Sequence, residues 1–523
     1  MGLDILKKYL TSLNLIFATE IVVVLLASLG VIPREAVLFL TGIMIFYMIF
    51  SSVEDSLWLT VASIPLFVAL PISDSFDTLA SWRIIIAVLF LCLFFKKGIS
   101  LNLVRSAKGR IRIKENLKHY GLEYIILAFL LVGLLSVSVA DYKILAVKKL
   151  LFLINIFLLF LIARNIVRSE QSIVRLWRAA AVGGVVVIAI ALIQFVAALF
   201  APLFLFWQFW ADKVIGVFYG QNLSYLLSYS NTWFAYYASN PPTLRLFSIF
   251  PDSHSFAMFC ILIIPVFLTL ALVVENQRKR RIFYWLMAGL AFLGIALSGS
   301  RGAWLSVLPV IAVAFYFYLK KLETAFFKKA ILSLVIFAVL FLASIGYPPL
   351  LYKFQAWQTG TEASSTFSFF ERAKSISDIG EISNKGRLEI WGASLKSVAK
   401  HPFLGVGLGN YVTVLEQNIS AAKKGASAHN LYLDLTSETG IFGGLLLFVL
   451  FANIFYTSWL VFRRAKETHF KFYGLLVGLY FLWIAAYSFF DVVLLNDKVL
   501  LMLMVVLAAL YNIRNIIFNP DKI

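Results

Sequence analysis

The sequence predicts an all-α protein: a polytopic membrane helix bundle of about 12 to 14 spans with a long extracytoplasmic helical loop. Three observations support this prediction. Of 523 residues, 61% are hydrophobic and 14% charged, whereas soluble domains carry about 25% charged residues. The mean hydropathy is +0.89, and one core cannot bury that excess because cores stop growing at about 250–300 residues. Finally, the apolar residues gather in stretches close to the roughly 17–25 residues that cross a bilayer.

Fourteen apolar stretches are candidate spans, and each is expected to be helical because a backbone in lipid must satisfy its own hydrogen bonds. They cover residues 13–32, 36–50, 57–72, 81–95, 120–139, 149–163, 179–200, 255–274, 282–300, 303–319, 330–346, 440–461, 473–494 and 499–513. The two cysteines, Cys92 and Cys260, lie inside such stretches. They therefore predict neither a disulfide framework nor a metal site.

Basic residues predict the topology. If Lys7 and Lys8 are cytoplasmic, the alternate loops and both termini hold 28 of the 46 Lys and Arg residues. Lys and Arg concentrate on the cytoplasmic side of membrane proteins, so an even span count with both termini inside is expected. The net charge of +19 is then explained by topology anchors that contact membrane lipids, and no nucleic-acid partner is predicted.

The predicted organisation has five parts. They are the N-terminal spans (1–200), an aromatic extracytoplasmic interfacial segment (201–250), the central spans (251–346), a long extracytoplasmic loop (347–438) and the C-terminal spans (439–523).

The interfacial segment holds 13 aromatic residues between positions 204 and 237 but only two charged residues, Asp212 and Lys213. Such a composition is typical of the membrane–water boundary. The segment is expected to be either a belt that seals loops to lipid or a platform for a lipid-linked substrate.

Within the long loop, residues 359–369 are rich in Ser, Thr and Gly and are expected to be mobile. Leu388, Trp391, Leu395 and Val398 recur at helical spacing, and Pro402 follows. This pattern predicts a helix that ends before the proline.

Two arginines on the predicted outer side are candidate anion-binding residues. Arg301 lies in a short turn of small residues, Ser298–Trp304, where an always-charged side chain is costly unless paired. The alternative is that it extends to lipid head groups. Arg387 lies at the start of a predicted helix, which suits a diphosphate. The alternative is a local pair with Glu389.

The stretch Gly405–Asn410 is rich in glycine, but no strand or βαβ unit precedes it, so it does not predict a nucleotide loop. It predicts a tight turn after Pro402, whose backbone N–H groups could form a nest for an anion.

His429 is one of only five histidines and immediately precedes Asn430 and a predicted span. An isolated histidine is more often structural than catalytic, but its place at the outer boundary makes His429 a candidate catalytic residue. Arg245 and the run Asp252–His254 form a further candidate site before another span. Asp252 could instead cap the helix that follows.

No Asp-x-Asp sequence and no cluster of His and carboxylates with metal-ligand spacing is present. The sequence therefore predicts neither a metal nor a cofactor. Glu20 is an isolated acid within the first predicted span, and it would be a proton-relay candidate in a transporter.

Four motifs, in this order around a long outer loop, resemble the bacterial O-antigen ligase and polysaccharide polymerase superfamily. They are Ser298–Trp304, Gly386–Trp391, His401–Asn410, and Ala428–Asn430 followed by Glu438–Gly440. The resemblance covers roughly residues 240–460, whereas the first ~180 residues match only as generic spans.

The resemblance implies a GT-C-type glycosyltransferase in the bacterial cytoplasmic (inner) membrane. Such an enzyme transfers a glycan from undecaprenyl diphosphate to an acceptor hydroxyl on the outer face, with inversion at the anomeric carbon and without a metal. Carried onto this sequence, His429 would be the catalytic base or would orient the acceptor. Arg301 and Arg387, with Arg245 as a further candidate, would bind the diphosphate. The acceptor is a glycan, a lipid or a protein. The enzyme could therefore be a polymerase, a ligase or a protein O-glycosylating enzyme, and these alternatives stay open.

The alternative is a transporter or flippase of a polysaccharide or lipid-linked oligosaccharide without transferase activity. Glu20 is its main support, because transporters use charged residues along a path across the membrane. The other candidate residues cluster on one face, which favours a transferase.

Overall fold

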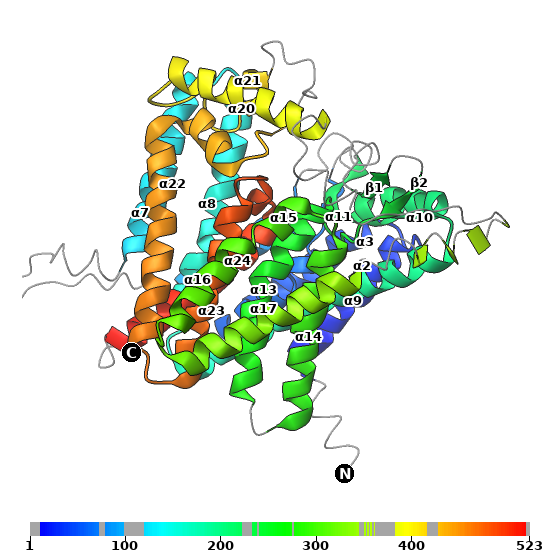
Figure 1. Ribbon diagram of the computed structural model, residues 1–523, viewed down its shortest axis with the longest axis horizontal. Coiled ribbons are helices and arrows are strands. Elements are labelled where there is room, and N and C mark those ends of the chain that lie inside the picture. Colours follow the sequence, from blue (N-terminus) through cyan, green and yellow to red (C-terminus); the bar gives the residue numbers. More distant parts are fainter. Residues whose placement is uncertain are drawn as a thin grey trace, which may run out of the picture.

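The computed structural model describes residues 11–518 except 73–78, 99–119, 222–232, 238–239, 275–276, 345–349, 352, 355, 358–359, 361–381 and 416–426. In this part of the chain, ten helices are long and apolar enough to cross a membrane (Figure 1). The described strands form one two-stranded antiparallel sheet, β1 (Phe234–Tyr237) and β2 (Asn240–Leu244). The predicted all-α, polytopic membrane fold is confirmed.

The membrane-spanning helices follow the predicted stretches closely. They are α7 (Gly121–Ser136, extended by the 3₁₀ turn η2, Val137–Val139), α8 (Lys143–Ile166), α9 (Glu170–Phe200), α13 (Ser253–Val273), α14 (Arg278–Leu297), α15 with α16 (Arg301–Leu305 and Leu308–Leu319), α17 (Thr324–Ser344), α22 (Leu431–Arg464), α23 (Thr468–Tyr487) and α24 (Asp497–Phe518). Two shorter apolar helices, α2 (Ser12–Ser28) and α3 (Ala36–Phe50), and the helix α5 (Ser81–Lys97) occupy the predicted N-terminal stretches.

One predicted span, 57–72, is wrong as a helix. The helix α4 (Val53–Ala62) has only ten residues, a rise of about 15 Å. It is followed by the 3₁₀ turn η1 (Ile64–Leu66) and then by extended backbone. Every side chain from Leu59 to Leu70 is buried. Non-helical backbone is tolerated inside a membrane only where protein covers it, and hydropathy alone cannot distinguish burial in protein from contact with lipid.

Loops predicted to be cytoplasmic meet at one end of the bundle. Lys97 pairs with Glu54, and Arg175 pairs with Asp55. His469 Nε2 lies 3.2 Å from Glu170 Oε1, and Lys471 Nζ lies 2.7 Å from Glu323 Oε1. These contacts group the loops as the basic residues predict.

The segment 201–250 combines α10 (Leu203–Phe209), the π-helix η3 (Trp210–Ile215), α11 (Gly216–Tyr219) and the small sheet. Some of its aromatic rings pack inward, because Trp233 stacks on Phe247 with centroids 4.7 Å apart and both are buried. Others face outward, such as Phe204, which is 66% exposed. The segment therefore both packs on the bundle and presents apolar surface.

The long loop contains two described helices, α20 (Ile382–Lys400) and α21 (Tyr411–Leu415). The predicted helix before Pro402 is therefore confirmed. Both helices lie across one end of the group formed by α7, α8 and α22 (Figure 1). Of the stretch 359–369, which is expected to be mobile, all but Gly360 lies outside the described residues.

Candidate functional site

Four chain segments meet at the end of the bundle opposite the predicted cytoplasmic loops. The backbone N–H of Leu246 donates to Leu297 O at 3.1 Å, which joins the end of β2 to the end of α14. Ser300 Oγ lies 2.6 Å from Tyr487 Oη, which joins the α14–α15 turn to the end of α23. Leu431 N donates to Ser488 O at 2.8 Å, which adds the start of α22. The predicted site residues therefore come from segments that touch one another.

Arg301 is the first residue of α15, in the short turn that the sequence predicts. Ser300 caps this helix by accepting a hydrogen bond from Ala303 N. Gly302 lies against the end of α23 and the turn after it, because a Cβ there would come within 3.1 Å of Tyr487 Cε2 and 2.8 Å of Phe490 Cβ. Arg245 follows β2, and its N–H donates to Trp233 O at 2.9 Å. Both arginine residues are partly exposed, although the Nε of Arg245 is buried.

Arg387 lies in the second turn of α20, so the prediction that it stands at a helix start is wrong. The helix dipole acts mainly in the first turn, and Arg387 therefore contributes its own charge rather than a helix N-terminus. Glu389 is exposed, and no ion pair joins these two described residues. The side chain of Arg387 acts electrostatically on His429 instead.

His429 precedes α22 in a buried turn. Its φ of 47° lies in the left-handed region. Asn430 caps α22 by accepting from Tyr432 N at 3.0 Å and Leu433 N at 3.1 Å. His429 Nδ1 is buried and has no hydrogen-bond partner among the described residues.

Charged groups around His429 set its protonation. Burial lowers the pKa of His429 below its ordinary value of about 6.5. Arg387 and His254 lower this pKa further, whereas Asp491 raises it. The imidazole is therefore neutral at pH 7, the form that can accept a proton.

Asp491 was not among the predicted site residues. His254 Nδ1 lies 2.6 Å from Asp491 Oδ2. Burial disfavours the carboxylate, yet His254 and His429 lower the pKa of Asp491 to about 2. Asp491 falls inside the predicted span 473–494, whereas α23 already ends at Tyr487. An acid within a predicted span was the signal that could have found it.

Asp252 caps the N-terminus of α13, which was the alternative to a role in a candidate site. Its carboxylate accepts from Ser255 N at 2.6 Å and from Ser255 Oγ at 2.8 Å. His254, two residues further along the chain, belongs to the cluster with Asp491 and His429. The run Asp252–His254 thus has a structural member and a member at the site.

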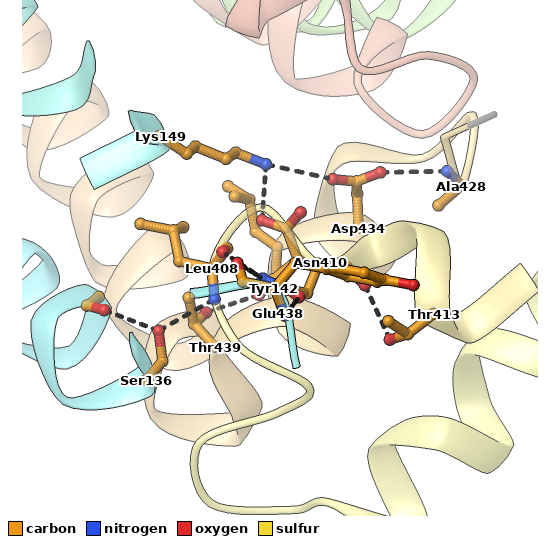
Figure 2. Close-up of polar contacts among 12 residues, drawn as sticks. Ser136, Tyr142, Lys149, Leu408, Asn410, Thr413, Ala428, Asp434, Glu438 and Thr439 are labelled. Carbon is orange, nitrogen blue, oxygen red and sulfur yellow. Dashed lines mark hydrogen bonds and ion pairs between the residues drawn. The ribbon is translucent and has the colours of Figure 1, made fainter. Parts of the chain in front are cut away.

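The glycine-rich turn Gly405–Asn410 is a packing element, and the hypothesis of an anion nest is wrong. Val406 N donates to Ser437 O at 2.9 Å, and Leu408 N donates to Ser136 Oγ at 3.1 Å. Figure 2 shows Leu408 and Asn410 beside Ser136 and Tyr142 of the α7–α8 corner. These N–H groups are therefore used to dock the turn onto the bundle.

Glu20 belongs to a buried network between helices. It accepts a hydrogen bond from Ser63 Oγ. Lys498, which is fully buried, interacts electrostatically with Glu20 and donates to Phe67 O at 2.6 Å. Protein rather than lipid surrounds Glu20, which is 1% exposed. The network ties α2 and η1 to α24, an arrangement that suits helix packing.

In the described part of the chain, no group of three or more His, Cys, Asp or Glu side chains is arranged to hold a metal ion. His254 and Asp491 make a pair, and two such ligands are too few for a structural or catalytic zinc site.

Comparison with known proteins bears on the same region. Residues 283–449 match the family model described as O-Antigen ligase. This part of the chain is therefore similar to the O-antigen ligase family. The matched residues include Arg301, Arg387 and His429, and the resemblance to the O-antigen ligase-like superfamily is confirmed.

Two curated relatives align with this O-antigen ligase-like chain. The ComP-specific O-oligosaccharyltransferase of Acinetobacter baylyi is 29% identical over 194 residues, which are 36% of this chain and 32% of that protein. An uncharacterized protein of Haemophilus influenzae is 24% identical over 199 residues, 36% of this chain and 47% of that protein. The alignments therefore span about a third and about half of these relatives.

Proposed function

We propose that this protein is a metal-independent, inverting glycosyltransferase of the bacterial cytoplasmic membrane. It transfers a glycan from undecaprenyl diphosphate to an acceptor hydroxyl on the outer face, as an O-antigen ligase or a surface-polysaccharide polymerase does. The observation that carries the proposal is the contact between α20, the helix that holds Arg387, and the turn of His429: Trp391 Nε1 donates to Ala428 O at 3.0 Å. This turn lies at the end of the bundle that also holds the Arg301 turn. A neutral proton acceptor and fixed cations are the groups that this reaction needs.

In the proposed reaction, the acceptor oxygen attacks the anomeric carbon on the side opposite the diphosphate, so the configuration inverts. The bond from the anomeric carbon to the diphosphate oxygen breaks as the new bond forms. His429 accepts the proton of the attacking hydroxyl, because burial and Arg387 keep the pKa of its imidazole low. The lipid diphosphate leaves with its electron pair and gains negative charge.

Arg301 and Arg387, together with Arg245, stabilise the departing diphosphate. A guanidinium presents several N–H donors in a planar fork that matches phosphate oxygens. Donors fixed where charge develops lower the barrier without reorganising during the reaction. The absence of a nucleotide-binding loop in the sequence agrees with a donor that arrives already activated on its lipid.

Reconstitution in proteoliposomes tests this proposal. An undecaprenyl diphosphate-linked glycan would be supplied with one of three acceptors: a second lipid-linked glycan, lipid A-core, or a protein with serine-rich segments. The protein arm is included because the A. baylyi relative is named as an O-oligosaccharyltransferase specific for ComP. We expect release of undecaprenyl diphosphate and an inverted linkage, read by mass spectrometry and NMR. Movement of the intact donor across the bilayer without transfer to any acceptor would favour the transporter alternative.

A further inference from the structure

The backbone of His429 is held in a conformation that needs support from its surroundings. Its φ of 47° is uncommon for any residue other than glycine. Strained conformations of this kind persist only where neighbouring groups fix the chain, and they often occur at functional sites. The contacts that fix this turn therefore bear directly on the placement of the imidazole.

Both polar atoms of the preceding residue, Ala428, are held by side chains from other parts of the chain. Its N–H donates to Asp434 Oδ2 at 3.1 Å, and its carbonyl accepts from Trp391 Nε1 at 3.0 Å. Ala428 is completely buried. On the other side of His429, the Asn430 cap and the bond from Leu431 N to Ser488 O fix the chain.

Asp434 in turn faces a cation from the N-terminal half of the protein. Its Oδ1 lies 4.0 Å from Lys149 Nζ, and the same Nζ lies 2.6 Å from Glu438 Oε2. Figure 2 shows Lys149 on α8 pointing toward both acids of α22, with Asp434 also bonded to Ala428. The two carboxylate side chains are only 5% and 2% exposed, so Lys149 is the cation that balances them.

We infer that Asp434 is a positioning residue: its Oδ2 fixes the Ala428 peptide and so places the imidazole of His429, while Lys149 holds the carboxylate in place. This inference rests on the proposed transferase function. Among the described residues, the Asp434 carboxylate contacts Ala428 N and Lys149 Nζ rather than the imidazole. Loss of the Ala428 bond should therefore misplace the base without weakening the hold on the diphosphate.

The test compares Asp434→Ala with Asp434→Asn. Asparagine keeps an oxygen acceptor for Ala428 N but lacks the charge for Lys149, whereas alanine removes both. We expect Asp434→Ala to lower kcat by about 10²-fold, because small misplacements of a reacting group cost about that much, with KM for the lipid-linked donor unchanged. Asp434→Asn should restore most of kcat. If Asn and Ala variants are equally impaired, the ion pair rather than the Ala428 bond matters, and the inference is overturned.

Trp391→Phe provides a second variant, because it removes the indole N–H that bonds Ala428 O and keeps a smaller aromatic ring. We expect it to lower kcat, again with donor KM unchanged. The matched control is Glu323→Gln, which removes a carboxylate from the Lys471 pair at the opposite end of the bundle. It should leave kcat and KM as in the wild type. A similar loss of kcat in this control would mean that global destabilisation explains the effect.

Hydrogen exchange of the Ala428 amide gives a readout independent of activity. Protection should be high in the wild type and in Asp434→Asn and lost in Asp434→Ala. An inactive wild type with normal protection would overturn the proposed function and, with it, the role in catalysis. An active wild type with an unprotected Ala428 amide would overturn the positioning inference alone.

Discussion

His254 and Asp491 form a 2.6 Å contact between Nδ1 and Oδ2 that joins the start of α13 to the turn after α23. Both residues of this pair, together with Arg387 of α20, influence the pKa of His429. Residues from α13, from α20 and from the turn after α23 therefore all influence the protonation of His429, which precedes α22. The protonation of His429 is therefore open to measurement.

The pH dependence of transfer should follow His429. Only the neutral imidazole accepts a proton, so the rate should rise with pH through a midpoint below about 6.5 and then level off. Asp491 raises the pKa of His429. Its replacement in Asp491→Asn should therefore move this midpoint to lower pH. Rates measured over a pH series, with protein folding monitored in parallel, check this, and a shift to higher pH would contradict the assignment.

His429→Ala should lower the transfer rate by on the order of 10²–10⁴, the usual loss for a general acid–base group. The variant should remain folded in detergent. His401→Ala is the matched control, because His401 is exposed directly after the end of α20. Near-normal product yield from folded His429→Ala protein would remove His429 from the mechanism.

Arg301→Lys and Arg387→Lys should both be poor enzymes, with a loss of about tenfold or more in kcat/KM. A lysine ammonium is a point charge and cannot form paired hydrogen bonds with phosphate oxygens. Arg463→Lys, an exposed change at the far end of α22, is the control for the substitution itself. Steady-state kinetics with varied lipid-linked donor provide the measurement. Full activity in both site variants would place the diphosphate elsewhere.

Transfer should continue in the presence of EDTA. The sequence lacks a metal-ligand motif, and the described residues contain no group of three ligands. The measurement is product yield with and without chelator, followed by addition of Mg²⁺ or Mn²⁺. Loss of activity on chelation with recovery on metal addition would show that the protein does bind a catalytic metal.

Glu20→Gln should leave transfer by the folded protein largely intact while lowering its thermal stability. Glu20 contacts Ser63 and lies near Lys498 within a buried network, where replacement of its carboxyl group disturbs the hydrogen bonding of buried polar groups. Unfolding temperature in detergent and transfer rate per folded molecule separate the two effects. A stable but inactive Glu20→Gln protein, together with active His429→Ala, would favour the transporter alternative.

Much of the fold follows from the order of residues along the chain. Apolar stretches such as 255–274 predict α13 because a spanning helix must be apolar over its whole length. The distribution of Lys and Arg along the chain predicts which loops lie on the same side of the membrane. The structure brings such loops together, for example through the contact of Arg175 with Asp55. The turn at Arg301, the helix before Pro402 and the span after His429 were likewise predictable from local patterns.

Tertiary structure decided what local patterns could not. The prediction of a helix over 57–72 failed because those residues are apolar through burial in protein, and extended backbone is permitted there. Asp491 joins His254, and Lys149 joins Glu438, across hundreds of positions, so their pairing depends on which helices pack together. The sequence by itself determined most of the segments that form membrane-spanning helices and the grouping of the basic loops, because both follow from one-dimensional patterns of hydropathy and charge. Only the packing of the helices decided which side chains meet at His429, since such contacts depend on three-dimensional distances that no local pattern encodes.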